Sequence, residues 1–359
     1  MIIKESEWIW NRLSKENRPV VLYGMGDGAE KILALCEKFG VKVQDIFASD
    51  EFVRGQSFAG FLVKRYSQIC ALYENPVILV AFGTEKPEIL EHIYVMAETA
   101  EVLAPDVPLF GHELADFSWL RQHRKEIQQV YDRLADEVSR KVFQNLIIYK
   151  LTGKIELLRD VTTPREEALD LIFPLDEQAV YIDLGAYDGD TLLEFREHAG
   201  EHYQKMLAWE PDRKNYMKLE RNIEKNQLEN VQIYPYASWS HAEKVIFNGC
   251  GGRNSSLGEG KKEYQVQAEA VDNILQGEPV SYIKMDVEGA EYQTLLGCRK
   301  TIETFAPKLA VSAYHRTWDF VELPLLLWHL NPGYQIFLRH HPYIPAWETN
   351  LYVINSSHL

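Results

Sequence analysis

Hydrophobic and polar positions divide the chain into three stretches that differ in periodicity. In the first and the last stretch, short apolar runs alternate with segments in which apolar residues recur three or four positions apart. The short runs predict buried strands and the periodic segments predict amphipathic helices, an alternation typical of a parallel sheet. The middle stretch shows the helical period alone. We therefore expect an α/β fold with two doubly wound, Rossmann-like domains, at residues 1–112 and 166–359, joined by a helical connector at 113–165.

A strand, a glycine turn and a helix follow one another near the start of the first domain. Val20–Tyr23 predicts the strand, Gly24-Met-Gly-Asp-Gly28 predicts the turn, and the helix is expected to end at Gly40. Asp50 follows the second predicted strand, where dinucleotide-binding folds hold a ribose with a carboxylate. The motif is incomplete, because Ala29 takes the position of the last glycine. Three interpretations stay open: a domain that binds NAD(P), one that binds a sugar nucleotide, and one that binds neither and serves interaction or orientation.

Weaker signals complete the first half of the chain. We expect helices at 4–17 and 87–99, strands at 61–63 and 76–81, and a closing segment at 107–110. The helical period of the connector predicts one long helix, or two in series, ending at Gly153. We interpret it as a linker packed between the domains, with a lid or a dimer surface as the alternative. Its apolar face comprises Ile127, Val130, Leu134, Val138, Val142 and Leu146.

The most informative turn lies in the last stretch. The apolar run Ala179–Ile182 predicts a buried strand, and Asp183 stands at its carboxyl end. Gly185 and Gly189 bracket a tight turn, and a helix is expected from Thr191 onward. Such a unit receives a nucleotide-like ligand at the carboxyl edge of a parallel sheet, because glycines let the backbone approach closely and the helix offers free N–H groups.

Three carboxylates distinguish this turn from a dinucleotide site: Asp183, Asp188 and Asp190. They would repel a pyrophosphate. An adenosyl group that bears a cationic centre suits them better. The turn therefore predicts S-adenosylmethionine as the cofactor.

Polar residues also follow the next two predicted strands, 206–209 and 231–234. Glu210, which precedes Pro211, lies 27 residues past Asp183 and can accept hydrogen bonds from both ribose hydroxyls. The residues expected at the adenine edge are Tyr236, Ala237 and Ser238. The glycine-rich segment 248–256 is either a mobile loop that closes over the donor or substrate, or simply the end of a hairpin.

Acidic residues gather around a further predicted strand at 282–285. Asp286 stands at its carboxyl end, and Glu288 and Glu291 are expected on one face of the helix that follows. Asp286 can hold the amino group of the donor or take a proton from an attacking hydroxyl. Three histidines follow later strands and are expected to cluster with Asp286 and Glu288: His315, His340 and His341. A histidine of near-neutral pKa is a natural general base.

The composition of the chain argues against several classes of function. The 359 residues carry 38 Lys and Arg against 53 Asp and Glu, a net charge of −15, which argues against a general binder of nucleic acid or of an anionic membrane. A local basic patch is still compatible with this balance. The four cysteines have no CxxC spacing, so we expect reduced thiols and no metal site. The absence of a signal peptide or of a long apolar run predicts a cytoplasmic protein.

Residues from about 170 to 355 resemble the FkbM family of S-adenosylmethionine-dependent methyltransferases. The resemblance rests on Tyr181-Ile-Asp-Leu-Gly-Ala-Tyr-Asp-Gly-Asp-Thr191, on Trp209-Glu-Pro-Asp212, and most specifically on Ile283-Lys-Met-Asp-Val-Glu-Gly-Ala-Glu291. The connector and the histidine-containing tail are similar to a bacterial branch of that family, which often carries an N-terminal Rossmann-like domain.

The resemblance implies a seven-stranded sheet with the last strand inserted antiparallel, and O-methylation of a sugar or another small molecule. Apart from the resemblance, our own hypothesis for the reaction is that Asp286 or His315 is the catalytic base and that Glu288 binds substrate hydroxyls. The residues expected to bind S-adenosylmethionine are Asp183, Gly185, Ala186, Tyr187, Asp188, Gly189, Thr191, Glu210, Pro211, Tyr236, Ala237, Ser238 and Asp286.

Three other readings stay open beside this one. Asp183, Asp286 and Glu288 lie at adjacent predicted strand ends and would offer oxygen ligands to Mg²⁺. An oxidoreductase would instead use the glycine turn and Asp50 of the first domain. A binding protein would keep a non-catalytic methyltransferase fold. A homodimer is left open as well.

Overall fold

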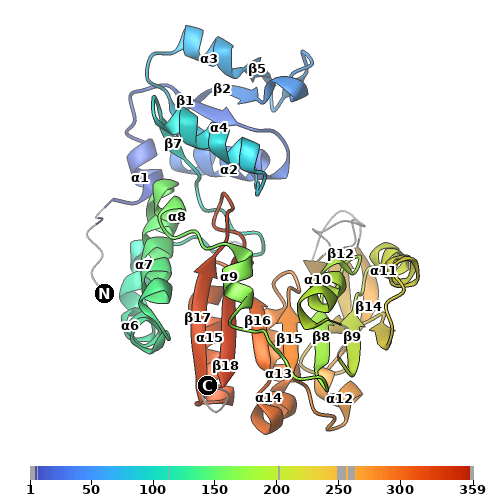
Figure 1. Cartoon of the computed structure of the whole chain (residues 1–359). Helices are drawn as coiled ribbons and strands as arrows, with labels where there is room; N and C mark the ends of the chain where they lie inside the picture. Colours follow the sequence, from blue (N-terminus) through green and yellow to red (C-terminus); the bar gives the residue numbers. More distant parts are fainter. Residues whose placement is uncertain are drawn as a thin grey trace. The chain divides into compact units, whose positions relative to one another are not determined.

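A computed structural model describes residues 5, 7–111, 113–200, 203–248, 256–257 and 263–355. The chain forms two compact units, and each combines segments that are distant in the sequence (Figure 1). The N-terminal unit comprises Met1–Tyr131, Val138–Thr163 and His340–Glu348. The C-terminal unit comprises Asp132–Glu137, Pro164–Arg339 and Thr349–Leu359. The boundaries expected at 112 and 165 stay a prediction.

The N-terminal unit is built on a parallel five-stranded sheet of order β5-β2-β1-β6-β7. Its strands are β1 (Val20–Tyr23), β2 (Val43–Ala48), β5 (Lys64–Arg65), β6 (Val77–Val80) and β7 (Glu101–Leu103). The helices are α1 (Ile9–Leu13), α2 (Asp27–Phe39), α3 (Tyr66–Leu72) and α4 (Pro87–Ala97), with a 3-10 turn η1 (Asp50–Phe52). A separate ribbon pairs β3 (Ser57–Phe58) with β4 (Phe61–Leu62). The sheet thus has the alternating strand–helix order that the hydrophobic pattern predicts.

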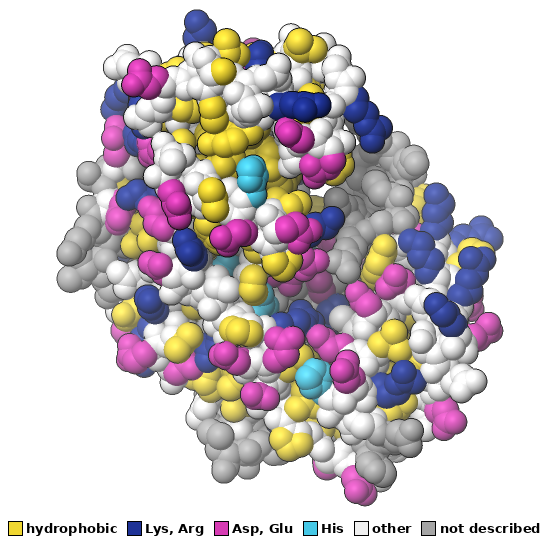
Figure 2. All heavy atoms as spheres, turned by 45° about the horizontal axis from the view of Figure 1, so that its top comes forward, with side chains coloured by type: hydrophobic (Ala, Val, Ile, Leu, Met, Phe, Trp, Pro, Cys, Tyr) yellow, Lys and Arg dark blue, Asp and Glu magenta, His cyan; other side chains and the backbone are white. Residues whose placement is uncertain are grey.

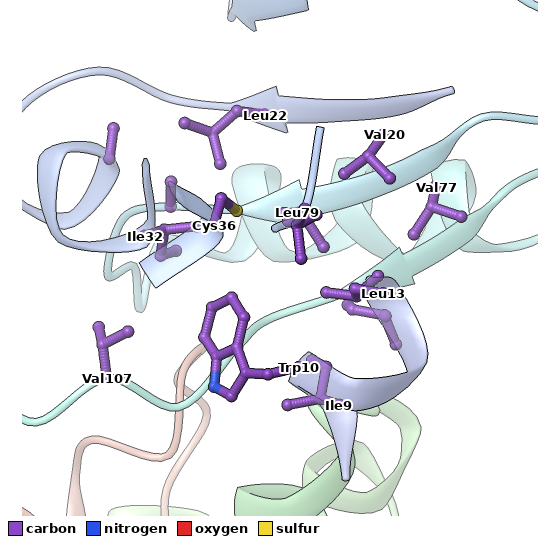
Figure 3. Packing of buried hydrophobic residues seen from close by; sticks show 14 of the residues in the cluster. Ile9, Trp10, Leu13, Val20, Leu22, Ile32, Cys36, Val77, Leu79 and Val107 are labelled. Carbon is purple, nitrogen blue, oxygen red and sulfur yellow. The ribbon is translucent and has the colours of Figure 1, made fainter. Parts of the chain in front are cut away.

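The core of this unit explains the apolar runs. Every residue of β1 and of β6 is buried, as expected for a parallel sheet covered on both faces. Figure 3 shows Trp10 of α1 packed below the sheet with Ile32, Cys36 and Leu79 nearby. The helix expected at 4–17 is therefore shorter than predicted, and it buries Ile9, Trp10 and Leu13.

Two features of the first half were not predicted correctly. The last strand of the sheet, β7, was not predicted, and the closing segment at 107–110 follows it. The connector consists of shorter helices: α5 (Phe117–Gln122), α6 (Arg124–Arg133), α7 (Glu137–Thr152) and α8 (Glu156–Arg159). Gly153, with a φ of +69°, ends α7 as predicted. Val138 was expected on the buried face but is 48% exposed, because the break between α6 and α7 resets the helical phase.

The C-terminal unit is built on a seven-stranded sheet of order β10-β9-β8-β15-β16-β18-β17. The strands are β8 (Val180–Leu184), β9 (Lys205–Trp209), β10 (Val231–Tyr234), β15 (Tyr282–Met285), β16 (Lys308–Ser312), β17 (Tyr334–His340) and β18 (Thr349–Asn355). Pairing is parallel from β10 to β16, and β18 runs antiparallel to β16. The sheet therefore matches the expected one with an antiparallel last strand.

Helices and a small second sheet surround these strands (Figure 1). The helices are α9 (Arg165–Leu169), α10 (Asp190–Ala199), α11 (Arg213–Lys225), α12 (Val271–Leu275), α13 (Glu291–Gly297), α14 (Arg299–Phe305) and α15 (Asp319–Leu330). The four-stranded sheet has the order β11-β14-β12-β13, with β11 (Ala237–Ser238), β12 (Glu243–Asn248), β13 (Ser256–Leu257) and β14 (Glu263–Glu269). Of the expected glycine-rich loop at 248–256, residues 249–255 lie outside the described residues.

No helix among the described residues combines the length and the apolar character that a membrane span requires. Figure 2 shows acidic and basic side chains intermixed over most of one face, with Lys and Arg side chains gathered at the right edge. Figure 1 draws α11 on that side, and its exposed basic residues are Arg213, Lys214, Arg221 and Lys225. The same helix also exposes Glu220 and Glu224, so its outer surface carries charges of both signs.

Candidate active site

The glycine turn after β8 brings the backbones of three strands together. Gly185 has a φ of +86°, and a Cβ atom on it would lie 1.9 Å from the carbonyl oxygen of Asp286. Only glycine fits this position. The amides of Gly185 and Ala186 both donate to the carbonyl of Trp209, at 3.1 and 3.0 Å. Gly189, with a φ of +88°, then leads into α10. The turn therefore forms a cradle of backbone at the carboxyl edge of β8, β9 and β15.

Asp183 anchors this turn. Its carboxylate is fully buried; Oδ1 lies 3.3 Å from Lys284 Nζ, and Oδ2 accepts a hydrogen bond from the Thr191 hydroxyl. Lys284 Nζ also donates to the carbonyl oxygen of Gly185, at 3.2 Å. Burial raises the pKa of Asp183, although Lys284 and Thr191 act against it. Both oxygens of the Asp183 carboxylate therefore interact with side chains of the same unit, Lys284 and Thr191.

Glu210 presents a second buried carboxylate, directly after β9. It is 5% exposed; its Oε2 accepts the Tyr187 amide at 2.9 Å and its Oε1 accepts the Asp212 amide at 2.8 Å. Burial raises its pKa to about 7, against the opposing effect of those two amides. Each oxygen keeps a further lone pair, so the group can accept two more hydrogen bonds. Glu210 is therefore positioned to bind a pair of vicinal hydroxyls.

The other predicted cofactor residues line the same edge. Tyr187, with a φ of +49°, and Asp188 are half-buried in the turn, and Pro211 is half-buried next to Glu210. Tyr236 is half-buried after β10, while Ala237 and Ser238 are buried in β11. The Ser238 hydroxyl lies 3.0 Å from the Thr294 hydroxyl, so its side chain ties β11 to α13.

A group of acids surrounds one histidine beyond β15 and β16. We call Asp286, Glu288, Glu291 and His315 the carboxylate–histidine cluster. His315 Nδ1 lies 2.7 Å from Glu291 Oε1, and Nε2 lies 3.4 Å from both Asp286 Oδ1 and Glu288 Oε2. His315 and Glu291 are each 1% exposed. The adjacency of β8, β15 and β16 thus brings the predicted catalytic residues together beside the glycine turn.

The cluster shifts the pKa of its members. Burial lowers the pKa of His315, but Glu291, Glu288 and Asp286 outweigh burial and raise it to about 10. Burial raises the pKa of Glu288 to about 8. Burial also disfavours the Asp286 anion, but Lys284 and His315 outweigh it, so that pKa is lowered. The three carboxylates therefore favour the protonated form of His315, which argues against the near-neutral pKa expected of a histidine base.

One prediction about the cluster is corrected. Glu288 does not share a helix face with Glu291, because α13 begins only at Glu291 and Glu288 has a φ of +54° in the turn before it. His340 and His341 belong to the N-terminal unit and the cluster to the C-terminal unit, so the expected clustering of these histidines with Asp286 and Glu288 stays a prediction. His341 Nδ1 lies 2.9 Å from the carbonyl oxygen of Thr163.

Glu291 is the site residue that sequence reasoning left out of the catalytic set. Its Oε1 accepts the amides of Val287 and Gly289, at 3.1 and 3.4 Å, and also faces His315. The sequence feature that could have identified Glu291 as a site residue is its position at the end of the acidic segment 286–291. Its contact with His315 could not be foreseen, because 24 residues separate them in the chain.

The proposed Mg²⁺ site of Asp183, Asp286 and Glu288 does not agree with the contacts of Asp183. Asp183 is paired with Lys284 and bonded to Thr191, so it is not available beside Asp286 and Glu288. Among the described residues, the group whose ligand atoms lie within 4.8 Å of one another is Asp286, Glu291 and His315.

Packing explains the glycines of the N-terminal turn. A Cβ atom on Gly28 would lie 2.4 Å from the Ala81 carbonyl oxygen, and one on Gly24 would lie 2.6 Å from the Phe82 ring. Two acids, Asp27 and Glu30, stand in the first turn of α2, where they disfavour a bound phosphate. Asp50 is exposed in η1. These observations favour the interpretation in which this domain binds no dinucleotide.

Comparisons with known proteins found a family model and similar solved structures. Residues 183–343 match the family model described as the methyltransferase FkbM domain. The structure of methyltransferase FkbM from Methylobacillus flagellatus KT aligns with a TM-score of 0.72 at 20% identity, covering 94% of this chain and 90% of that chain. That likeness shows a shared fold over nearly the whole chain.

Two further solved structures align with about half of the chain. An rRNA methylase from Streptococcus thermophilus covers 54% of this chain and 98% of its own, at 12% identity and a TM-score of 0.36. A protein from Streptococcus mutans in complex with SAH covers the same shares, at 14% identity and a TM-score of 0.37. A comparison with curated protein sequences found no match.

Proposed function

We propose that this chain, whose residues 183–343 belong to the FkbM methyltransferase family, transfers a methyl group from S-adenosylmethionine to a hydroxyl of a carbohydrate or another small molecule. The observation that carries the proposal is the Glu210 carboxylate. It is buried, held by two backbone amides and turned to the edge where the glycine cradle lies. The carboxylate–histidine cluster lies at the same edge, after the adjacent strands β15 and β16.

The residues at this edge fit the cofactor. Gly185 carries no side chain and is half-buried in the turn, which supports close approach of the methionine part. Glu210 offers the two acceptor sites that a ribose needs, and Tyr236 and Ala237 follow β10 where an adenine would lie. S-adenosylmethionine supplies an activated methyl group on a positively charged sulfur, which the surrounding carboxylates favour.

Asp286 is the residue we assign to proton transfer. The acceptor oxygen gains a methyl group and must lose its proton, and that proton becomes strongly acidic as the new bond forms. A carboxylate that is ionised at neutral pH therefore suffices, and the lowered pKa of Asp286 keeps it so. His315, being a cation, stabilises the negative charges of Asp286 and Glu288 rather than acting as the base.

We expect the rest of the rate acceleration to come from positioning of the methyl donor and the acceptor. Methyl transfer from a sulfonium disperses charge, so alignment of donor and acceptor matters more than stabilisation of a new charge. Glu288 is half-buried next to Asp286 and can accept a hydrogen bond from an acceptor hydroxyl. Lys218 of α11 is compatible with an acceptor that carries an anionic group, since its Nζ lies 5.1 Å from the ring centroid of Tyr187 in the glycine turn.

Calorimetric titration with S-adenosylhomocysteine tests the proposal. We expect micromolar binding to the wild type and at least tenfold weaker binding to Glu210→Gln, because the amide cannot accept from both ribose hydroxyls. The matched control is Glu224→Gln, an exposed glutamate on α11, which should bind like the wild type. No binding to the wild type would overturn the proposal, and titration of NAD and sugar nucleotides would then test the N-terminal turn.

A further inference from the structure

We propose that Glu291 is a positioning residue, which holds the His315 imidazole with its Nδ1–H bonded to Glu291 and its Nε2–H turned toward Asp286. Glu291 does not meet the acceptor itself and acts through this imidazole. Its part in methyl transfer rests on the proposed function, whereas the state of the imidazole does not.

The contacts of Glu291 place one proton on His315 Nδ1. Glu291 Oε1 accepts the amides of Val287 and Gly289, at 3.1 and 3.4 Å, and lies 2.7 Å from His315 Nδ1. An oxygen that accepts two N–H groups acts as an acceptor in the third contact as well, so Nδ1 is the donor there. Both side chains are 1% exposed, so this contact is shielded from solvent.

The second ring nitrogen faces two further carboxylates. His315 Nε2 lies 3.4 Å from Asp286 Oδ1 and 3.4 Å from Glu288 Oε2. Asp286 Oδ1 is inaccessible to solvent and has no hydrogen-bond partner among the described residues. A proton on Nε2 gives this buried oxygen a positive neighbour, and buried charges need such a neighbour. The Asp286 side chain as a whole is 33% exposed, which leaves Oδ2 as the oxygen that can meet an acceptor hydroxyl.

The surrounding charges favour the same state of the imidazole. Four carboxylates lie near it, three on the segment after β15 and one on its own segment: Asp286, Glu288, Glu291 and Asp319. Burial lowers the pKa of His315, but the carboxylates, with Glu291 foremost, outweigh burial and raise it to about 10. Nearby cations have other partners: Lys284 pairs with Asp183, and Arg316 Nε donates to the Gly289 carbonyl at 2.8 Å.

Other contacts hold the turn in place without Glu291. The Arg316–Gly289 hydrogen bond joins the segment after β15 to the segment after β16. The Asp286 amide donates to the Leu184 carbonyl, at 2.9 Å, and so fixes the start of the turn. The charge of Glu291 can therefore be removed while the turn stays attached, which separates positioning of the imidazole from support of the fold.

The imidazole matters because of the proton that the reaction releases. In the proposed reaction the acceptor oxygen forms a bond to the methyl group, the sulfur keeps the electron pair of the broken bond, and the hydroxyl proton passes to Asp286. Burial disfavours the Asp286 anion, and Lys284 and His315 outweigh burial and lower its pKa. Glu291 keeps His315 protonated and oriented, and so keeps Asp286 ready to take the proton.

Nuclear magnetic resonance of the full chain, labelled with ¹⁵N in its histidines, tests this inference without any acceptor. His315→Gln identifies the His315 signals by their loss. In the wild type we expect both ring nitrogens of His315 to stay protonated from pH 6 to pH 8. In Glu291→Gln the amide oxygen can still accept N–H groups but the charge is gone, so the pKa of His315 should fall by about 1–3 units.

The matched control is Glu224→Gln, the same change at an exposed position of α11, which should leave the His315 signals as in the wild type. If Glu291 only supports the turn, Glu291→Gln leaves the pKa of His315 unchanged, and that result would overturn the inference. The wild-type spectrum decides even where a variant does not fold, because a His315 with a single protonated nitrogen at pH 7 would overturn the inference as well.

Titration with S-adenosylhomocysteine shows that each variant is folded and separates the two proposals. A lowered pKa of His315 in Glu291→Gln, without binding of S-adenosylhomocysteine to the wild type, would overturn the proposed function alone. Binding of S-adenosylhomocysteine to both proteins, with the pKa of His315 unchanged between them, would overturn the positioning role alone.

Discussion

At the scale of single residues, burial shifts the pKa values of the side chains at the carboxyl edge of the C-terminal sheet. Glu210 and Glu288 are ordinary glutamates in the sequence, but burial raises their pKa to about 7 and about 8. His315 moves the other way from a typical buried histidine, because three carboxylates surround it. The same residue types on the surface would titrate far from these values.

The pKa of Glu210 predicts a pH dependence of cofactor binding. Its carboxylate must be ionised to accept two ribose hydroxyls, and the free protein takes up a proton there below about pH 7. The affinity for S-adenosylhomocysteine should therefore rise between pH 6 and pH 8, by about tenfold per unit below the pKa. Calorimetry at both values measures this. Glu210→Gln should bind weakly at both, and an equal pH dependence in that variant would assign the titration to another group.

At the scale of elements, a buried ion pair joins two central strands. Lys284 of β15 lies 3.3 Å from Asp183 of β8, with side chains 13% and 0% exposed. Lys284 Nζ also donates a hydrogen bond to the carbonyl oxygen of Gly185. The same lysine therefore contacts both the neighbouring strand β8 and the glycine turn that follows it. Both residues sit in register, as direct partners in the β8–β15 ladder.

Breaking this pair should be costly. Lys284→Met leaves Asp183 buried without its cation, and we expect a loss of about 3–5 kcal/mol in the free energy of unfolding. Adding Asp183→Asn should recover part of that loss, because the uncompensated charge is then removed. Urea denaturation of both variants and the wild type measures the coupling. Equal stability of Lys284→Met and the wild type would show that the pair contributes nothing.

At the scale of the whole molecule, the two compact units are assembled from interleaved segments. The N-terminal unit includes residues 340–348, which lie close to the end of the chain. Within that unit, Ile344 exchanges two backbone hydrogen bonds with Thr84, at 2.9 and 3.1 Å, and Trp347 and Tyr343 pack on Gly83. This sheet edge after β6 is thus completed by residues far away in sequence.

Stability of the N-terminal unit should therefore depend on its C-terminal segment. Ile344 is fully buried, so Ile344→Ala should destabilise this unit by about 2–5 kcal/mol. Hydrogen exchange of the amides in β6 and at Thr84 would report the change. Val95→Ala, at a position 50% exposed, is the control and should change stability by less than about 0.5 kcal/mol. Faster exchange confined to β15 and β16 would contradict the assignment.

The sequence alone determined the main strand–turn–helix units of both domains and the residues at the carboxyl ends of their strands. Strand–turn–helix signals are local, so Gly185, Glu210 and Asp286 could each be placed at an edge from their neighbours alone. The antiparallel last strand came from the family resemblance, and the strand order agrees with it. The site assignments themselves stay predictions that the experiments above test.

Only the tertiary structure decided which of these side chains meet. His315 reaches Glu291 because β16 pairs with β15, whereas His340 and His341 follow the chain into the other unit. Glu288 faces His315 because a positive φ turns it out of the helix that was expected to carry it. Asp183 meets Lys284 across a strand pair, which removes it from the proposed Mg²⁺ site. Contacts between distant segments depend on strand order and burial, which local periodicity does not encode.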